Sequence, residues 1–155
     1  MENKKITVDD IYVSPLKAKM VTNAEGWMRM EPVSPTPPQT DSPFMNEVAR
    51  LLARDCGTTP QQIAREAKIK PKIAYALFQY QTGEPIDLFL KQYRLKTARE
   101  WLACTDLPIS EVAKRSGFTS HGTFSRTFLE ATGVSPTKYR KAHRPENYKI
   151  MYKWE

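Results

Sequence analysis

The stretch Glu111–Arg140, EVAKRSGFTSHGTFSRTFLEATGVSPTKYR, contains a short apolar pattern that stops at Gly117 and restarts one turn later. Phe124 and Phe128 in the restarted part are four residues apart, which is the spacing of one face of an α-helix. Glycine commonly ends helices because it can adopt a left-handed backbone. The stretch therefore predicts a short helix, a tight turn and a longer helix over residues 119–131.

The same pattern occurs earlier in the chain. IAREAKI at residues 63–69 matches VAKRSGF at residues 112–118, and LFQYQTGEP at residues 77–85 matches TFLEATGVS at residues 127–135. Each copy predicts a short helix, a turn and a longer helix that ends in Thr-Gly, which is typical of a helix-turn-helix motif. We therefore expect two such motifs.

Helical periodicity continues through the central hundred residues, and several prolines fit the first turn of a helix. The predicted helices cover residues 44–55, 60–67, 71–81, 85–103, 108–115, 119–131 and 136–142. We expect an all-α fold in which these seven helices form two helix-turn-helix subdomains joined by a long helix. The expected divisions are residues 1–43 (N-terminal extension and Pro-rich linker), 44–83 (first subdomain), 84–104 (linker helix), 105–143 (second subdomain) and 144–155 (tail). Residues 44–143 are expected to form one double helix-turn-helix domain.

The two chain ends have a different character. Residues 32–43, PVSPTPPQTDSP, hold five prolines and predict an extended linker. Before them, ITVDDIYV and GWMRM have weak strand character in an otherwise mostly irregular extension. The tail NYKIMYKWE alternates aromatic or aliphatic residues with lysine and methionine, the period of a half-buried strand. We expect a short β pairing of the two ends with each other or with a second copy.

Basic charge is concentrated in the middle of the chain. The 155 residues carry a net charge of +7, with a pI near 9.4. Residues 44–144 hold 17 Lys/Arg and 9 Asp/Glu, whereas the segments on either side are nearly neutral. Such an excess favours a polyanionic partner, most simply nucleic acid, with an acidic protein or a lipid surface as alternatives.

Cysteine and histidine are too sparse for a metal site. Cys56 and Cys104 are far apart and predict free thiols, and His121 and His143 are the only histidines. The chain has no run of about 18 apolar residues and no signal peptide at its N-terminus. We expect a soluble, cytoplasmic, nucleoid-associated protein with no metal, no cofactor and no membrane contact.

The second helix of the second motif presents two unlike faces. On a helical wheel, Phe124, Phe128 and Ala131 form the face expected to be buried. The opposite face is small and polar and holds Thr119, Gly122, Thr123 and Arg126, with His121 and Ser125 at its edges. Such residues allow a close approach to base edges in a major groove, and one arginine can bond guanine or a phosphate. The alternative is a solvated polar face.

The corresponding helix of the first motif is bulkier. Its expected buried residues are Ile73, Ala74, Leu77 and Phe78, and its expected outward residues are Lys72, Tyr75, Ala76 and Gln79. Lys72 and Gln79 suit phosphate or adenine contacts, and Tyr75 suits a thymine methyl. Alternatively, the tyrosines only pack at the surface. A linker helix of about 18 residues spans about 27 Å, which suits two reading helices in successive major grooves about 34 Å apart.

The motifs RLKTAREWL (94–102), LPISEVAKRSGFTSHGTFSRTF (107–128) and TGVSPTKYR (132–140) resemble the DNA-binding domain of AraC/XylS-type bacterial transcription regulators. The resemblance covers about residues 44–142. It implies two helix-turn-helix subdomains that bind double-stranded DNA and regulate transcription, with no enzymatic activity. By position, the resemblance implies that base contacts come from His121, Gly122, Thr123, Arg126, Lys72, Tyr75 and Gln79.

A second set of basic and hydroxyl residues is expected to contact phosphates. Its members are Lys70, Thr119, Ser120, Ser125, Lys138 and Arg140. Ser120 or Thr119 can also cap the helix, whose N-terminal amides favour a phosphate. Ala76 and Leu129 depart from the pattern, because an arginine and a lysine are common at these positions. Each departure is expected to lower the salt dependence of DNA binding by about one unit of slope.

Residues 1–43 are too short for the sensor domain that many such regulators carry. We therefore expect no small-molecule effector domain, and the chain resembles a free-standing small member or a piece of a longer protein. RNA polymerase or another regulator is a further candidate partner, and we expect a monomer or a weak dimer. The alternative function is a protein-interaction module or co-regulator that keeps the fold but binds DNA weakly or without specificity.

Overall fold

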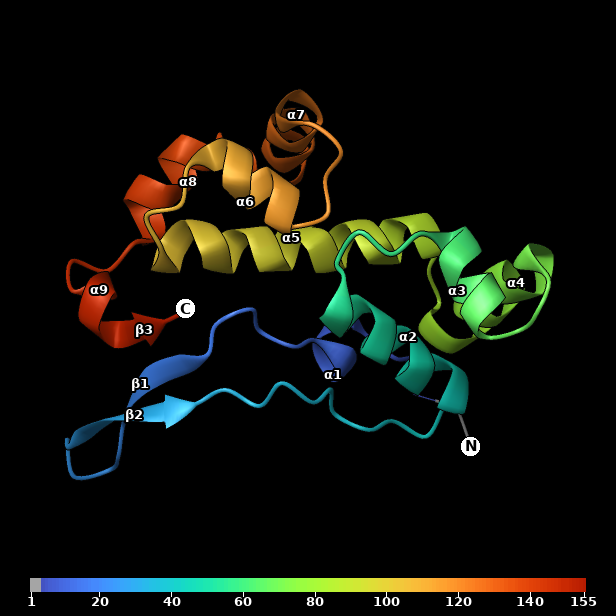
Figure 1. The fold of residues 1–155 in the computed structure, drawn as a ribbon, viewed down its shortest axis with the longest axis horizontal. Coiled ribbons are helices and arrows are strands. Elements are labelled where there is room, and N and C mark those ends of the chain that lie inside the picture. Colours follow the sequence, from blue (N-terminus) through green and yellow to red (C-terminus); the bar gives the residue numbers. More distant parts are fainter. Residues whose placement is uncertain (1–3) are drawn as a thin grey trace. The chain divides into compact units, whose positions relative to one another are not determined.

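The computed structural model describes residues 4–155, which form helices joined by short loops and a small antiparallel sheet (Figure 1). The helices are α1 (Val8–Ile11), α2 (Pro43–Arg54), α3 (Pro60–Glu66), α4 (Pro71–Thr82), α5 (Ile86–Cys104), α6 (Ile109–Arg115), α7 (His121–Thr132), α8 (Pro136–His143) and α9 (Tyr148–Met151). The strands are β1 (Ala18–Thr22), β2 (Met28–Pro32) and β3 (Tyr152–Lys153). The fold is therefore mostly helical, as the periodicity predicts, with a three-stranded sheet added.

The seven predicted helices all form, each within two residues of the expected bounds. Local chemistry explains where they begin: the hydroxyls of Ser42, Thr59 and Ser135 each accept an N–H from the first helical turn. Prolines occupy the first turns of α2, α3, α4 and α8, where their missing N–H leaves no hydrogen bond unmade.

Contacts divide the chain into two compact units. The first unit contains the described residues up to Val13 together with Thr36–Arg94, and the second contains Ser14–Pro35 together with Leu95–Glu155. The boundary lies inside α5, between Arg94 and Leu95, so each half of this helix belongs to a different unit. The N-terminal extension is likewise divided between the two units.

The first unit buries an apolar core built from α1, α2, α3, α4 and the first half of α5. Ile11 of α1 lies in this core, although the sequence around it suggested weak strand character; Val8–Ile11 is in fact helical. Thr7 and Asp10 explain the helix, because their side chains and backbones form a capping box. In α5, Phe89 packs edge-to-face on Phe78 with ring centroids 5.4 Å apart.

The second unit has its own core, formed by the second half of α5 with α6, α7 and α8. Phe124 and Phe128 are fully buried, and Tyr139 of α8 packs edge-to-face on Phe128 at 5.3 Å. Cys104 of α5 is buried and free, as predicted, and burial raises the pKa of its thiol to about 11. Cys56 in the first unit is likewise a thiol and not part of a disulfide.

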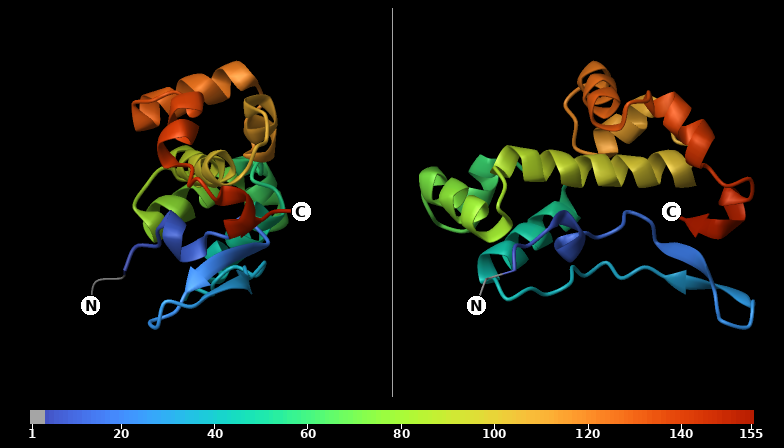
Figure 2. Two further views of the ribbon diagram at one scale, coloured as in Figure 1. Left: turned by 90° about the vertical axis from the view of Figure 1, so that its left-hand side faces the viewer. Right: turned by 180° about the vertical axis from the view of Figure 1, so that it is seen from behind.

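The two chain ends pair in the sheet, which confirms one of the two expected pairings. The strand order is β2-β1-β3, all antiparallel, and Ala18 of β1 lies opposite Pro32 of β2 and Lys153 of β3 (Figure 2). The extension is thus less irregular than expected, because Met28–Pro32 and Ala18–Thr22 form a hairpin. The tail is only partly a strand, because Tyr148–Met151 forms one helical turn first.

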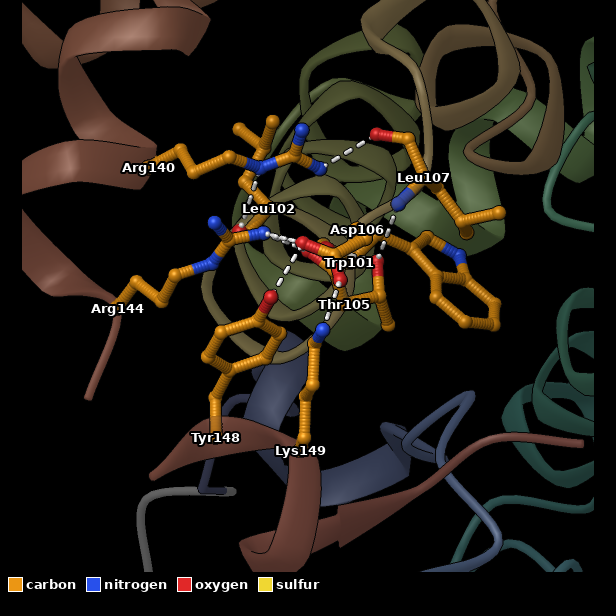
Figure 3. A network of polar contacts seen from close by, with 9 residues as sticks. All are labelled: Trp101, Leu102, Thr105, Asp106, Leu107, Arg140, Arg144, Tyr148 and Lys149. Carbon is orange, nitrogen blue, oxygen red and sulfur yellow. Dashed lines mark hydrogen bonds and ion pairs between the residues drawn. The ribbon is translucent and has the colours of Figure 1, made fainter. Parts of the chain in front are cut away.

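A cluster of polar contacts holds the tail onto the second unit (Figure 3). Arg144 and the Tyr148 hydroxyl both donate to the carboxylate of Asp106, each at 2.5 Å. These contacts lower the pKa of Asp106, with the hydrogen bond from Tyr148 as the largest cause. Further along, Trp154 packs edge-to-face on Trp101 at 5.9 Å. The aromatic tail therefore contacts its own unit.

Two kinds of feature are absent from the part of the chain that the structure describes. None of the helices in residues 4–155 is long and apolar enough to cross a membrane. The same residues contain no group of three or more His, Cys, Asp or Glu side chains that could hold a metal ion.

Candidate nucleic-acid interface

The turns of the two motifs have the same backbone geometry. In the first, Lys68 adopts a left-handed backbone with φ of 58°, and in the second Gly117 does so with φ of 87°. The amide after each donates to a carbonyl five residues earlier: Ile69 to Ala64 and Phe118 to Ala113, both at 3.0 Å. The sequence repeat is therefore a structural repeat, and each motif fixes its second helix in the same local way.

The second helices, α4 and α7, also end alike. The hydroxyls of Thr82 and Thr132 donate to the carbonyls four residues earlier, both at 2.7 Å. Gly83 and Gly133 follow with left-handed backbones that end the helices. This arrangement explains why both copies of the repeat end in Thr-Gly.

An arginine supports each motif from the helix that follows it. Arg94 of α5 donates to the carbonyls of Cys56 and Thr58, at 2.8 and 2.9 Å. Arg140 of α8 donates to the carbonyls of Leu102 and Leu107, at 3.0 and 2.7 Å. Burial lowers the pKa of both guanidinium groups. Arg140 therefore has a structural role that the sequence did not suggest, and its phosphate contact remains a prediction.

The structure brings most of the predicted reading residues of α7 together on one exposed surface. Phe124 and Phe128 point into the core, but Ala131, expected to be buried with them, is exposed because the buried stripe is narrower than the helical wheel implied. The exposed members of the predicted set are Thr119, Ser120, His121, Gly122 and Arg126, and the half-buried members are Thr123 and Ser125. Within residues 4–155, Arg126 makes no hydrogen bond or ion pair, so its guanidinium is available to a ligand.

The start of α7 is defined by Ser120, which caps the helix and so moves its first residue from the expected Thr119 to His121. The Ser120 oxygen accepts the N–H of Thr123 at 3.1 Å, and its hydroxyl donates to that of Thr123 at 2.9 Å. These bonds orient the first turn of α7 before any ligand arrives. The N–H of His121 and Gly122 have no intrahelical acceptor, as at every helix start, and favour an anion.

Gly122 is not required by the packing of the protein itself. A Cβ added at this position meets no atom of the described residues within 4 Å, and the backbone of Gly122 is not left-handed. Glycine lowers helix stability by up to about 1 kcal/mol relative to alanine, so it has a cost here without an internal benefit. Close approach of an external partner to this turn gives the glycine a physical reason.

A shallow pocket of about 500 Å³ lies beside this surface. His121, Gly122 and Arg126 line one side, and Leu129 also reaches it with 49% of its surface exposed. The start of α8 forms another side through Ser135 and Thr137, which the sequence analysis did not single out. The N-cap pattern Ser-Pro at residues 135–136 was the available signal for them.

The exposed face of α4 differs in chemistry. Lys72, Tyr75, Ala76 and Gln79 are all exposed, as expected, and Phe78 and Ala74 are buried. Ile73, however, is 48% exposed rather than buried, because the core of the first unit takes only a narrow stripe of α4. Tyr80 is also exposed, so this helix carries bulky apolar side chains where α7 carries small polar ones.

Two of the remaining predicted phosphate contacts are exposed basic residues at helix starts. Lys70 is the N-cap residue of α4, where no side chain makes a capping bond. Lys138 lies in the first turn of α8, and its amide is bonded by the Ser135 hydroxyl oxygen at 3.2 Å. Both positions place a cation next to free helix amides, which suits a phosphate.

Comparison with known proteins identifies helix-turn-helix relatives of this chain. Residues 63–142 match a family described as helix-turn-helix domain. The chain is 36% identical over 102 residues to the transcriptional activator NphR of Rhodococcus sp, which covers 64% of this chain and 30% of NphR. The chain spans less than a third of the length of each of the first curated relatives that it matches.

Solved structures with the same fold include two of particular interest. The C-terminal domain of AraT, a response regulator from Geobacillus stearothermophilus, aligns with a TM-score of 0.65 at 26% identity over 71% of this chain and 93% of that one. The DNA-binding domain of the global transcriptional factor AdpA, solved in complex with a target DNA, aligns with a TM-score of 0.61 at 27% identity over 66% and 93%.

Proposed function

We propose a function for this chain from one premise: it belongs to the AraC-type family of helix-turn-helix domains found in bacterial transcription regulators. The chain is a sequence-specific regulator that binds double-stranded DNA and places α4 and α7 in successive major grooves. It acts where the DNA is, in the cytoplasm, and its function is binding rather than catalysis. The DNA complex of AdpA and the activator NphR support this proposal by similarity.

One observation on this chain carries the proposal most directly: the exposed first turn of α7. It combines a glycine that the fold does not need with hydroxyls held in place by capping bonds, and Arg126 in the next turn makes no hydrogen bond or ion pair within residues 4–155. A helix start with these properties can lie close to base edges, and Arg126 can bond a guanine in two places. The positive charge around it supplies attraction that does not depend on sequence.

Base contacts are assigned to His121, Gly122, Thr123 and Arg126 of α7 and to Lys72, Tyr75 and Gln79 of α4. Phosphate contacts are assigned to Lys70, Lys138, Thr119, Ser120, Ser125 and Arg140. Among these, Arg140 can add a phosphate contact only through guanidinium N–H groups that its two carbonyl bonds leave over.

Gly122→Leu tests the proposal. Because no atom of residues 4–155 lies within 4 Å of the added Cβ and leucine favours a helix more than glycine does, the variant is expected to unfold at the same temperature as the unaltered chain or a slightly higher one. Its binding to sequences selected from a random duplex pool is expected to fall, because the side chain keeps the helix out of the groove. Ala131→Leu, an exposed position elsewhere on α7, is the matched control and is expected to bind normally. Full binding by Gly122→Leu would remove α7 as the reading helix.

A protein-interaction function is a second candidate, and exposed Leu129 beside the pocket is the observation that favours it. RNA polymerase or another regulator is the partner of interest. The aromatic tail packs on its own unit through Trp154 and gives this function no further support. A chain that shows no salt-dependent binding to any duplex would have the second function and not the first.

A further inference from the structure

The outer edge of β2 is an unused pairing surface on the second unit. In the sheet, β2 pairs only with β1, and no other strand of residues 4–155 lies along its second edge (Figure 1). Trp27 and Met28, at the end of this strand, are 75% and 59% exposed. Large apolar side chains beside an open strand edge are a common feature of sites where another strand is added.

The hydrogen-bonding direction along β2 follows from its neighbours. The amide of Asn23 donates to the carbonyl of Trp27 at 2.9 Å, and that of Val33 to the carbonyl of Lys17 at 2.8 Å. The backbone N–H and C=O groups of successive residues point to opposite edges of a strand, so those of residues 27, 29, 31 and 33 point toward β1. The N–H groups of Met28 and Met30 therefore point outward, and neither makes a hydrogen bond within the described chain.

We propose that a second copy of this chain pairs with β2 in an antiparallel, two-fold symmetric way centred on Met30. The segment WMRMEPV, residues 27–33, is self-complementary about that centre. Arg29 lies opposite Glu31 of the second copy, and Glu31 opposite Arg29. Trp27 lies opposite Val33 and Met28 opposite Pro32, so the apolar residues also meet apolar partners.

The charges of Arg29 and Glu31 favour a two-fold axis at Met30 over an axis at either neighbouring residue. A two-fold axis at Arg29 would put two arginines opposite each other, and one at Glu31 would do the same with two glutamates, which destabilises a strand pair. Within one chain, Arg29 and Glu31 already form an exposed ion pair at 2.7 Å. In the paired state Arg29 and Glu31 of each copy form a two-by-two block on one face of the sheet, in which each charge has an opposite charge both across the strands and along its own strand.

The occupant is a second copy rather than an unrelated strand because the complementarity lies within one sequence. Pro32 offers no N–H to the outer edge, so the pairing is limited to the few bonds around Met30 and does not extend into a longer ladder. An isologous contact of this kind uses the same edge on both chains and closes after two. Its small size predicts a weak dimer, below the area of a stable interface.

The pairing itself does not depend on DNA; only its consequence, two regulators that bind adjacent sites together, rests on the proposed function. The first measurement is therefore made without DNA. Sedimentation equilibrium of the full chain up to about 1 mM is expected to show a reversible monomer–dimer equilibrium. A chain that stays monomeric throughout overturns the proposal, whatever its DNA binding. A chain that dimerises but does not bind DNA would support the pairing and contradict the proposed function.

Charge variants test the register. Arg29→Glu and Glu31→Arg, each alone, put like charges opposite each other and are expected to raise the dimer dissociation constant by more than about tenfold. An equimolar mixture of the two is expected to dimerise again, because each chain then meets the opposite charge. Loss of a contact within one chain could not be restored by mixing, so a mixture that stays monomeric contradicts the register.

The charge variants also alter a pair within one chain, because Lys19 of β1 lies opposite Glu31 of β2. A variant without a charge change therefore gives an independent test of the pairing. Met30→Pro removes the outward N–H and leaves the bonds to β1 in place, so the dimer is expected to disappear. Met30→Ala keeps the N–H and is the control, expected to dimerise more than Met30→Pro. Circular dichroism confirms that each chain is folded. Equal association of the two variants would mean that backbone pairing at Met30 is not involved.

Discussion

The two helix-turn-helix motifs share a framework and differ in the surface they present. Both have a left-handed turn residue, a Thr-Gly end and a supporting arginine from the next helix, with nearly equal distances. On this common framework, α4 exposes Ile73 and Tyr80, whereas α7 exposes Gly122 and Arg126. The difference teaches that the framework residues repeat because they set geometry, and that the outward residues are free to specialise.

The largest expected difference concerns DNA binding. Arg126→Ala is expected to weaken specific binding by about 1–3 kcal/mol and to relax the preference at one base position, because a bidentate contact is lost. Lys70→Ala is expected to weaken binding to all duplexes alike, because its proposed contact is with a phosphate. Selection from a random pool, with binding at two salt concentrations, measures both.

Lys141→Ala removes an exposed cation of α8 outside the predicted set and is the control for net charge. If Arg126→Ala leaves the selected sequences unchanged, the second motif is not the main reader of sequence. A sequence-selective loss in Lys70→Ala would contradict its phosphate role and give it a base contact instead.

The turns are expected to differ in stability by a smaller amount. Lys68 has a left-handed backbone, which is unfavourable for residues with a Cβ. Lys68→Gly is therefore expected to raise the free energy of unfolding or leave it unchanged. Gly117→Lys is expected to lower it by about 1–2 kcal/mol. Urea unfolding of both variants measures the difference. A loss of stability in both variants would mean that the left-handed position of the first turn does not favour glycine.

Restoring the missing cations tests how far each surface has lost phosphate affinity. Leu129→Lys and Ala76→Arg are each expected to steepen the salt dependence of DNA binding by about one unit of slope. Because Leu129 lies beside the pocket on the α7 side, its substitution also reports on the interaction function. A weaker binding of a partner protein with unchanged salt slope would assign Leu129 to protein contact.

The smallest expected effect is on the attachment of the tail. The pKa of Asp106 is lowered in the folded chain from its ordinary 3.8, chiefly by the hydrogen bond from Tyr148. A lowered pKa means that the unfolded form binds protons more strongly, so the contribution is present above about pH 4 and lost as pH falls through the lowered value. Tryptophan fluorescence during acid titration measures this loss. Asp106→Asn is expected to lack this transition, and an unchanged titration would exclude Asp106 as its cause.

Much of the framework could be predicted because its signals are local. Glycine, proline and hydroxyl caps act within one turn of the chain, so helix bounds followed from the sequence to within two residues. The exposure of Ala131 and Ile73 could not be predicted, because a helical wheel gives the direction of a side chain but not the width of the face that a neighbouring element covers. The role of Arg94 and Arg140 was equally hidden, since their acceptors lie more than thirty residues away in the chain.

The sequence by itself determined the repeat, the helices, the basic middle and the small polar face of α7, because periodicity and caps depend only on neighbours along the chain. Tertiary structure alone decided that the tail packs on its own unit. It also decided that a Cβ at Gly122 would meet no atom of residues 4–155 within 4 Å, and that none of the strands in these residues covers the outer edge of β2. Each of these depends on contacts between segments distant in the chain, and nothing in the local pattern records which distant segment comes close.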